Sequence, residues 1–157
     1  MRNLRFFLRV LTIVLSIPAS SGHLYSGQDS LHIINVVRLH PRFDKLVPSN
    51  LKIEKIAGGH KWVEGPVWNR REGYLLFSDI PKNSIYRWQE GRGESLFLKP
   101  SGYTGKAPFG GAEPGSNGLA FSPDGLLTIC QHGNRRVIRV NPHGDITVLA
   151  DAHEGRR

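Results

Sequence analysis

The segment Trp-Val-Glu-Gly-Pro-Val-Trp, at residues 62–68, returns in altered form at residues 115–121 as Gly-Ser-Asn-Gly-Leu-Ala-Phe. Aligning the two segments places Glu64 on Asn117 at an offset of 53 residues. A self-match at a fixed period is the sequence signature of a repeat architecture, and it has to be recognised before any single element is assigned.

The self-match extends well beyond this motif. It continues through three further pairs of segments at offsets of 51 or 52 residues: 73–78 with 125–130, 84–88 with 136–140, and 97–98 with 148–149. Each copy contains four short apolar or alternating runs separated by Gly, Pro, Asn and Asp, a pattern typical of strands joined by tight turns. Four strands in about 50 residues is the period of a propeller blade. The alternative is two unrelated β-meanders, which the coincidence of the polar residues disfavours.

The repeat predicts eight strands in two blades. They are expected at 64–68, 74–78, 84–88 and 94–98, and again at 117–121, 126–130, 136–140 and 146–150. Residues 51–56 alternate strictly and predict one further strand ahead of the first blade. A six-bladed ring at this period needs about 310 residues. The predicted fold class is therefore all-β, a β-propeller of typically four to eight blades with only about the first two blades present.

The N-terminus has the layout of a secretory signal peptide. Three arginines precede an apolar run at residues 10–17, and small residues follow it. The run is too short to span a membrane, although an uncleaved anchor is the alternative. We therefore expect a signal peptide at 1–22, a secreted or periplasmic protein, and no membrane association after cleavage.

The remaining chain divides at the first blade. We expect a linker and N-terminal wrap at 23–50 and a partial propeller at 51–157, with blade one at 64–99 and blade two at 116–151. The formal net charge of +8 is spread over the termini and the turns. No basic helix or nucleic-acid signature is present, so no nucleic-acid partner is expected.

Alternation also predicts which side chains of blade two are buried. The single cysteine, Cys130, lies in a predicted strand and is expected to be a small buried hydrophobic residue. The uncovered face of the blade is expected to expose some of a set of apolar side chains: Leu119, Phe121, Leu127, Ile129, Val137 and Val140.

Blade geometry predicts where polar side chains gather. Glu64 and Asn117 begin the two inner strands, while Asp79 and His132 lie at the second-to-third turns. These positions and the long loop at 100–115 should meet at one mouth of the channel. Glu and Asn offer the oxygen ligands that hard cations take, so the mouth is a candidate cation site. Ordinary turn carboxylates, turn caps and turn residues are the alternative interpretation.

At these residues the sequence resembles the gluconolactonase, senescence-marker-protein and luciferin-regenerating-enzyme-like family. The resemblance covers roughly residues 41–157 and depends on five segments: 62–68, 76–81, 100–105, 114–119 and 130–136. The resemblance implies a six-bladed propeller with a divalent cation in its channel that hydrolyses sugar lactones and related esters. It implies that Glu64 is a metal ligand and that the remaining metal ligands lie beyond residue 157.

The predicted function follows from that resemblance. We expect the N-terminal part of a metal-dependent lactone hydrolase, inactive by itself, with a small-molecule lactone or sugar-derived substrate. Ca²⁺ is the expected ion, with Mg²⁺ or Zn²⁺ as alternatives. Asn117 and Asp79 are the predicted substrate-pocket residues, and His132 is the predicted catalytic residue. The alternative function is a non-catalytic β-propeller binding module that uses the loop at 100–115 for recognition.

Overall fold

The computed structural model describes residues 36–51 and 53–156. The predicted signal peptide at 1–22 lies outside the described residues. The chain divides into two units, Met1–Ile56 and Ala57–Arg157. No helix in the described ranges has the length and apolar character needed to cross a membrane.

The described part of the first unit contains one short 3-10 helix, η1, at Pro41–Lys45. The ring of His40 caps it by accepting a hydrogen bond from the backbone N–H of Arg42 at 3.1 Å. The strand expected at 51–56 is wrong, since the described residues of this segment belong to no strand. Alternation expresses a local preference, but a strand also needs a neighbour that satisfies its backbone N–H and C=O groups.

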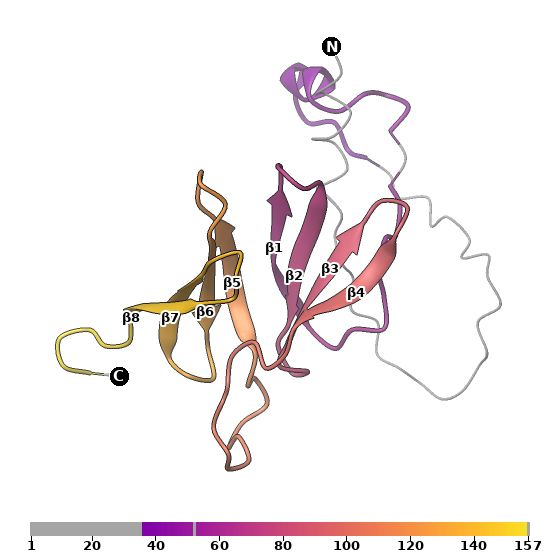
Figure 1. The fold of residues 1–157 in the computed structure, drawn as a ribbon. Helices are drawn as coiled ribbons and strands as arrows, with labels where there is room; N and C mark the ends of the chain where they lie inside the picture. The colour runs from indigo at the N-terminus through magenta and orange to yellow at the C-terminus, as the bar shows by residue number, and fades with distance from the viewer. Residues whose placement is uncertain (1–35, 52, 157) are drawn as a thin grey trace, which may run out of the picture. The chain divides into compact units, whose positions relative to one another are not determined.

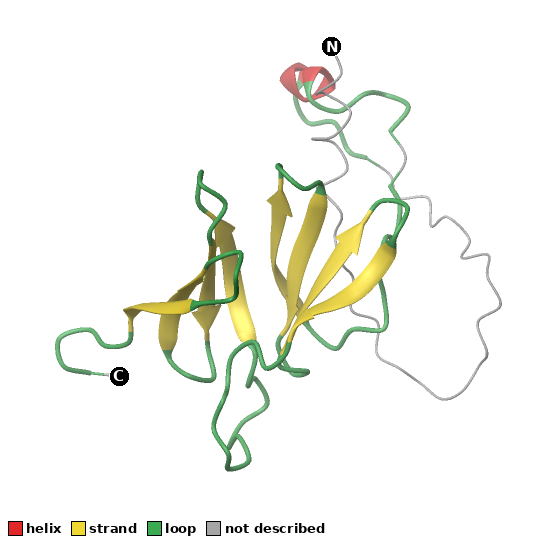
Figure 2. Cartoon of the chain, in the orientation of Figure 1, coloured by secondary structure: helices red, strands yellow, loops and turns green. Residues whose placement is uncertain are grey.

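The second unit contains two four-stranded antiparallel sheets in the orders β1-β2-β3-β4 and β5-β6-β7-β8 (Figure 1). The strands are joined by turns and loops without a helix (Figure 2). Their bounds are β1 Val63–Asn69, β2 Tyr74–Asp79, β3 Ser84–Gln89, β4 Gly93–Leu98, β5 Ser116–Phe121, β6 Leu127–Gln131, β7 Arg136–Val140 and β8 Ile146–Ala150. All eight predicted strands are confirmed with boundaries shifted by at most one residue. The two meanders are consecutive blades, which confirms the predicted fold class.

Local turn chemistry explains why the chain reverses at the same places in both blades. After β1, the Asn69 side chain accepts backbone hydrogen bonds from Arg71 and Glu72, each at 3.0 Å. After β5, the Ser122 hydroxyl accepts the backbone N–H of Leu126 at 3.0 Å. Both turns end on a glycine with positive φ, a conformation that costs glycine nothing sterically.

The second-to-third turns repeat as well. Asn83 has φ 52° and Arg135, its equivalent in the second copy, has φ 51°. Left-handed backbone is uncommon outside glycine. The same unusual conformation at the same repeat position shows that the two copies share backbone geometry as well as hydrophobic pattern.

The apolar core lies between the two blades. Its buried members come from the second and third strands of each: Tyr74, Leu76, Ile85, Leu127, Ile129 and Ile138. Each fully buried side chain of this size contributes about 1.5–3 kcal/mol. The blade interface is therefore a principal source of stability in this unit.

One expectation about blade two is wrong, and a second holds for only one residue of its set. Leu127 and Ile129 of β6 are buried in the interface, so Cys130, which follows Ile129 and projects to the opposite face, is exposed. The apolar set expected on the uncovered face mostly packs inward too, and within that set Val137 lines the surface hollow on blade two. Alternation separates the two faces of a strand, but it does not say which face meets the neighbouring blade.

The register brings the inner-strand starts and the inter-blade loop to one end of both sheets. Val63 of β1 pairs with Asp79 at the end of β2, and Ser116 of β5 pairs with Gln131 at the end of β6. The β2–β3 turn, the β6–β7 turn and the loop between β4 and β5 all lie at this end (Figure 1). We call it the mouth end, and its assembly agrees with the expectation from blade geometry.

Candidate functional site at the mouth end

Both inner strands are interrupted by a bulge, and the two bulges lie within one residue of each other in the repeat alignment. The pairing of β1 with β2 shifts between Glu64 and Val67, and the pairing of β5 with β6 shifts between Ser116 and Leu119. Bulges are enriched next to active sites, where they redirect side chains. The two bulges enclose the residues that the repeat alignment singled out, because Glu64 borders the first and Asn117 lies within the second.

The Glu64 carboxylate is half-buried and accepts a hydrogen bond from the Trp62 indole. The distance from Trp62 Nε1 to Glu64 Oε1 is 2.9 Å. Residues two apart in an extended chain project to the same face, which explains why these side chains meet. Within the part of the chain that the structure describes, no cationic side chain pairs with Glu64.

Glu64 and Asn117 are brought onto adjacent strands by a backbone contact. A methyl group on Gly65 would lie 2.2 Å from the Asn117 carbonyl oxygen, so β1 and β5 approach as closely as glycine permits. The buried Ser78 hydroxyl donates to the same carbonyl at 3.1 Å and lies 2.8 Å from the Ser116 hydroxyl. These contacts fix the backbone of Asn117 against blade one.

Asp79 was expected to line a substrate pocket, but it lies elsewhere. Its side chain is fully buried and faces the segment that leads into β1. The carboxylate accepts the backbone N–H groups of Lys61 and Trp62 at 3.1 and 3.4 Å, and Lys82 Nζ lies 3.3 Å away. This environment supports a structural role, and the substrate-pocket role stays a prediction.

His60 is a buried partner of Asp79 that the sequence did not reveal. Its Nδ1 lies 3.3 Å from Asp79, and its Nε2 lies 2.9 Å from Glu94. The rings of Phe77 and Tyr86 enclose it at centroid distances of 5.0 and 4.7 Å. Since loop residues have no periodicity, no sequence signal predicts this contact.

His132 is half-exposed at the β6–β7 turn, and its Nδ1 lies 3.4 Å from Glu113 Oε2. The histidine and Asn117 line the same open hollow on blade two, whereas Glu64 and Asp79 do not line it. The other residues that line it are Gly118, Cys130, Gln131, Arg135, Arg136, Val137, Ala150, Asp151, Ala152, His153 and Arg156. The structure therefore brings together Asn117 and His132 in one concavity, and Glu64 and Asn117 on neighbouring strands.

Both blades hold the base of the long loop. Asn83 accepts the backbone N–H groups of Ser101 and Gly102 at 3.1 and 2.7 Å and donates to the Tyr103 carbonyl at 2.8 Å. From blade two, Gln131 donates to the Ser101 carbonyl at 3.0 Å. The loop therefore leaves the mouth from a fixed base, and Lys106 within it is exposed.

Glu64 and Asn117 offer ligands of the type that hard cations bind, but two residues are too few to complete a coordination shell. Within residues 36–51 and 53–156, no group of three or more His, Cys, Asp or Glu side chains is arranged to hold a metal ion. Glu64 and Asn117 offer the carboxylate and amide oxygens that Ca²⁺ and Mg²⁺ prefer, but these ions take six or more ligands. Zn²⁺ fits a pair of oxygen ligands such as Glu64 and Asn117 less well, because its usual protein ligands are nitrogen and sulfur.

Two consecutive four-stranded meanders with matched inner-strand bulges define the class of the protein, which is a β-propeller. The sequence pattern of the SMP-30/gluconolactonase/LRE-like region matches residues 62–157. The chain belongs to this family.

Individual relatives agree with that assignment. The chain is 35% identical over 149 residues to a gluconolactonase of Zymomonas mobilis, a match that covers 94% of this chain and 42% of the relative. An X-ray structure of a protein assigned as a gluconolactonase superposes with a TM-score of 0.62 at 29% identity, covering 76% of this chain and 37% of that one.

A second solved structure shows likeness in fold alone. It is a gluconolactonase from Xanthomonas campestris described as important in glucose secondary metabolic pathways, with a TM-score of 0.51 and 24% identity. The match covers 62% of this chain and 29% of that one. The chain thus spans less than half the length of each of these three relatives.

Proposed function

We propose that the protein hydrolyses a sugar lactone or a related ester with a divalent cation bound at its mouth end, and that this chain supplies the part of the site carried by its first two blades. The observation that carries the proposal is the approach of Gly65 to Asn117, which holds Glu64 and Asn117 on neighbouring inner strands. The names of the relatives support a lactone as the substrate class.

The bound ion, Glu64 and Asn117 each have a proposed task in the hydrolysis. A bound divalent cation supplies polarisation of a carbonyl and activation of water. Glu64 contributes a carboxylate oxygen to hold the ion, with Ca²⁺ preferred over Mg²⁺ and Zn²⁺. Asn117 offers its amide to the substrate in the hollow that it shares with His132.

His132 is the proposed proton carrier. It is half-exposed beside Glu113, so its ring is accessible and has a carboxylate that can orient it. Hydrolysis adds water across the C–O bond of the ester, so one proton leaves the attacking water and one reaches the departing ring oxygen. A histidine at the mouth suits both transfers because an imidazole ring can accept a proton and later donate it.

The direct test is hydrolysis of glucono-δ-lactone by the full-length gene product, corrected for the spontaneous reaction without protein. We expect hydrolysis that EDTA abolishes and that added Ca²⁺, Mg²⁺ or Zn²⁺ restores to different degrees. Equal rates with and without EDTA would remove the metal from the proposal, and no hydrolysis in either case would remove the activity.

A non-catalytic binding module remains the second candidate. It is favoured by the loop between β4 and β5, whose base is fixed and whose Tyr103 and Phe109 rings lie 5.2 Å apart. Aromatic side chains on a rigid base suit recognition of a ligand. Calorimetric binding of a sugar or lactone that is not turned over would favour this alternative.

We also propose that the protein is exported to the periplasm or the medium. The basic, apolar and small-residue order of the first 22 residues supports this. Cell fractionation and N-terminal sequencing of the mature protein provide the test. A cytoplasmic protein that retains its first residues would contradict export.

A further inference from the structure

Trp62 is a large aromatic residue whose polar atom is engaged although its ring is open to solvent. The residue is 53% exposed, yet its indole N–H donates to Glu64 Oε1 at 2.9 Å. The bond is charge-assisted, since its acceptor is a carboxylate, and such bonds are stronger than those between neutral groups.

The backbone of Trp62 is held on both sides. Its N–H donates to the buried Asp79 carboxylate at 3.4 Å, and its carbonyl accepts the N–H of Ile80 at 3.0 Å. Asp79 is itself fully buried. The indole therefore projects from a fixed point, so that Asp79 and Ile80 position Trp62 and Trp62 in turn positions Glu64.

We propose that Trp62 is a positioning residue for cation binding by Glu64. This inference rests on the proposed function. An ionised carboxylate has about four lone-pair sites, so one indole bond leaves three for an ion. Holding the glutamate in one rotamer removes an entropic cost that a mobile side chain would meet on binding the ion. Hydrogen-bond partners of this kind typically alter metal affinity by about 10–100-fold.

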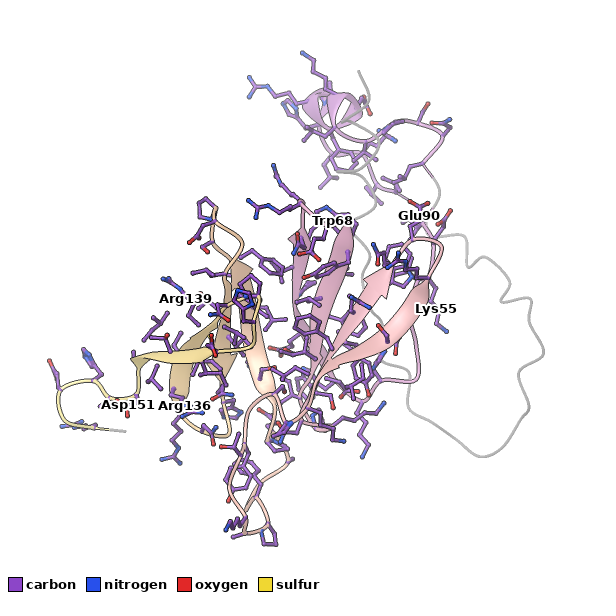
Figure 3. All side chains as sticks on the ribbon, in the orientation of Figure 1. Lys55, Trp68, Glu90, Arg136, Arg139 and Asp151 are labelled. Atoms are coloured by element: carbon purple, nitrogen blue, oxygen red, sulfur yellow. The ribbon has the colours of Figure 1, made fainter. Side chains whose placement is uncertain are left out.

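The experiment is calorimetric titration of the full-length gene product with Ca²⁺. Trp62→Phe keeps an aromatic ring but removes the donor, so we expect affinity to fall on the order of ten-fold. Trp68→Phe is the matched control, because Trp68 lies at the other end of β1, where it pairs with Leu75 (Figure 3). The control should bind Ca²⁺ as the wild type does.

A second variant separates the donor from the ring. Trp62→Gln removes the ring but keeps an N–H donor, so its affinity should lie nearer to the wild type than that of Trp62→Phe. Thermal unfolding of each variant confirms that it is folded. Indole fluorescence of the wild type gives a further readout, because Ca²⁺ should change an emission component that Trp68→Phe retains and Trp62→Phe lacks.

The outcomes distinguish this inference from the proposed function. If the wild type binds no Ca²⁺, the proposed cation site fails. If the wild type binds and Trp62→Phe binds equally well or more tightly, the positioning role of Trp62 is overturned while the site stands. Equal losses in Trp62→Phe and Trp62→Gln would also overturn it, since an N–H donor at this position would then recover no Ca²⁺ affinity.

Discussion

Gly65 of β1 lies so close to Asn117 of β5 that a single methyl group on the glycine would fall 2.2 Å from the asparagine carbonyl oxygen. At this glycine the inner strands of the two blades therefore approach each other through their backbones. This contact lies beside Glu64, so the packing of the blades and the geometry of the candidate site depend on the same glycine.

Replacing Gly65 by alanine should destabilise the protein strongly. The residue has φ +59° and no space for a Cβ atom. Left-handed backbone costs an L-residue about 1–2 kcal/mol, and a clash with backbone adds a cost of similar size or larger. We expect Gly65→Ala to lower the free energy of unfolding by roughly 3 kcal/mol or more in chemical denaturation.

Gly73→Ala provides the matched control for that experiment. Gly73 also has positive φ, at +69°, but no atom lies within 4 Å of the position that its Cβ would occupy. Gly73→Ala should lower the free energy of unfolding only by the cost of left-handed backbone in an L-residue, about 1–2 kcal/mol. Equal destabilisation by the two variants would show that the close approach of β1 to β5 contributes nothing to the effect of Gly65→Ala.

Glu64→Gln should weaken cation binding more than Asn117→Ala does. The first change removes a negative charge with almost no change in shape, and the loss should exceed the roughly 10–100-fold typical of an outer-shell partner. Asn117→Ala should mainly raise KM or lower kcat for the lactone. Calorimetry with Ca²⁺ and lactone kinetics on the full-length gene product measure both, and unchanged Ca²⁺ affinity in Glu64→Gln would refute the assignment of Glu64.

Asp79→Asn should destabilise the protein instead of changing its substrate use. The buried carboxylate accepts two backbone N–H groups and lies near His60 and Lys82. Hydrogen bonds to a charged group contribute roughly 1.5–3 kcal/mol each, and the neutral amide weakens several of them. Urea unfolding should show the loss. A changed KM at unchanged unfolding free energy would favour the pocket role predicted from the sequence.

Ionisation of Tyr74 is expected to lower the stability of the protein at alkaline pH. Burial raises the pKa of the Tyr74 hydroxyl above its ordinary value of 10.0, an effect opposed by its hydrogen bond to Asn69. Because the folded pKa is raised, its contribution to stability is fully present below pH 10.0 and is lost as pH rises through the folded pKa.

The measurement is urea unfolding between about pH 9 and about pH 11, compared between the wild type and Tyr74→Phe. The wild type should lose stability over this range, and the variant should lose less because it has no hydroxyl to ionise. An identical pH dependence in the two proteins would contradict this role for Tyr74.

Much of the fold was readable from the sequence because its signals are local. Glycine, asparagine and aspartate mark the turns of both blades, and the repeat supplies an independent check on each boundary. Asn83 and Arg135 illustrate this, since equivalent positions in the two copies adopt the same left-handed backbone. The mouth-end location of Glu64, Asn117, Asp79 and His132 was likewise predictable, because strand order in a meander fixes which strand ends lie together.

The tertiary structure alone decided which face of each strand is covered and which polar groups meet. Alternation marks Ile129 and Cys130 as opposite, but only packing against blade one shows that the isoleucine is buried and the cysteine exposed. Asp79 looked available in sequence, yet backbone N–H groups and His60 enclose it. Periodicity is a property of a single strand, whereas burial and hydrogen-bond partners are created when separate strands and loops come together, so no local pattern can specify them.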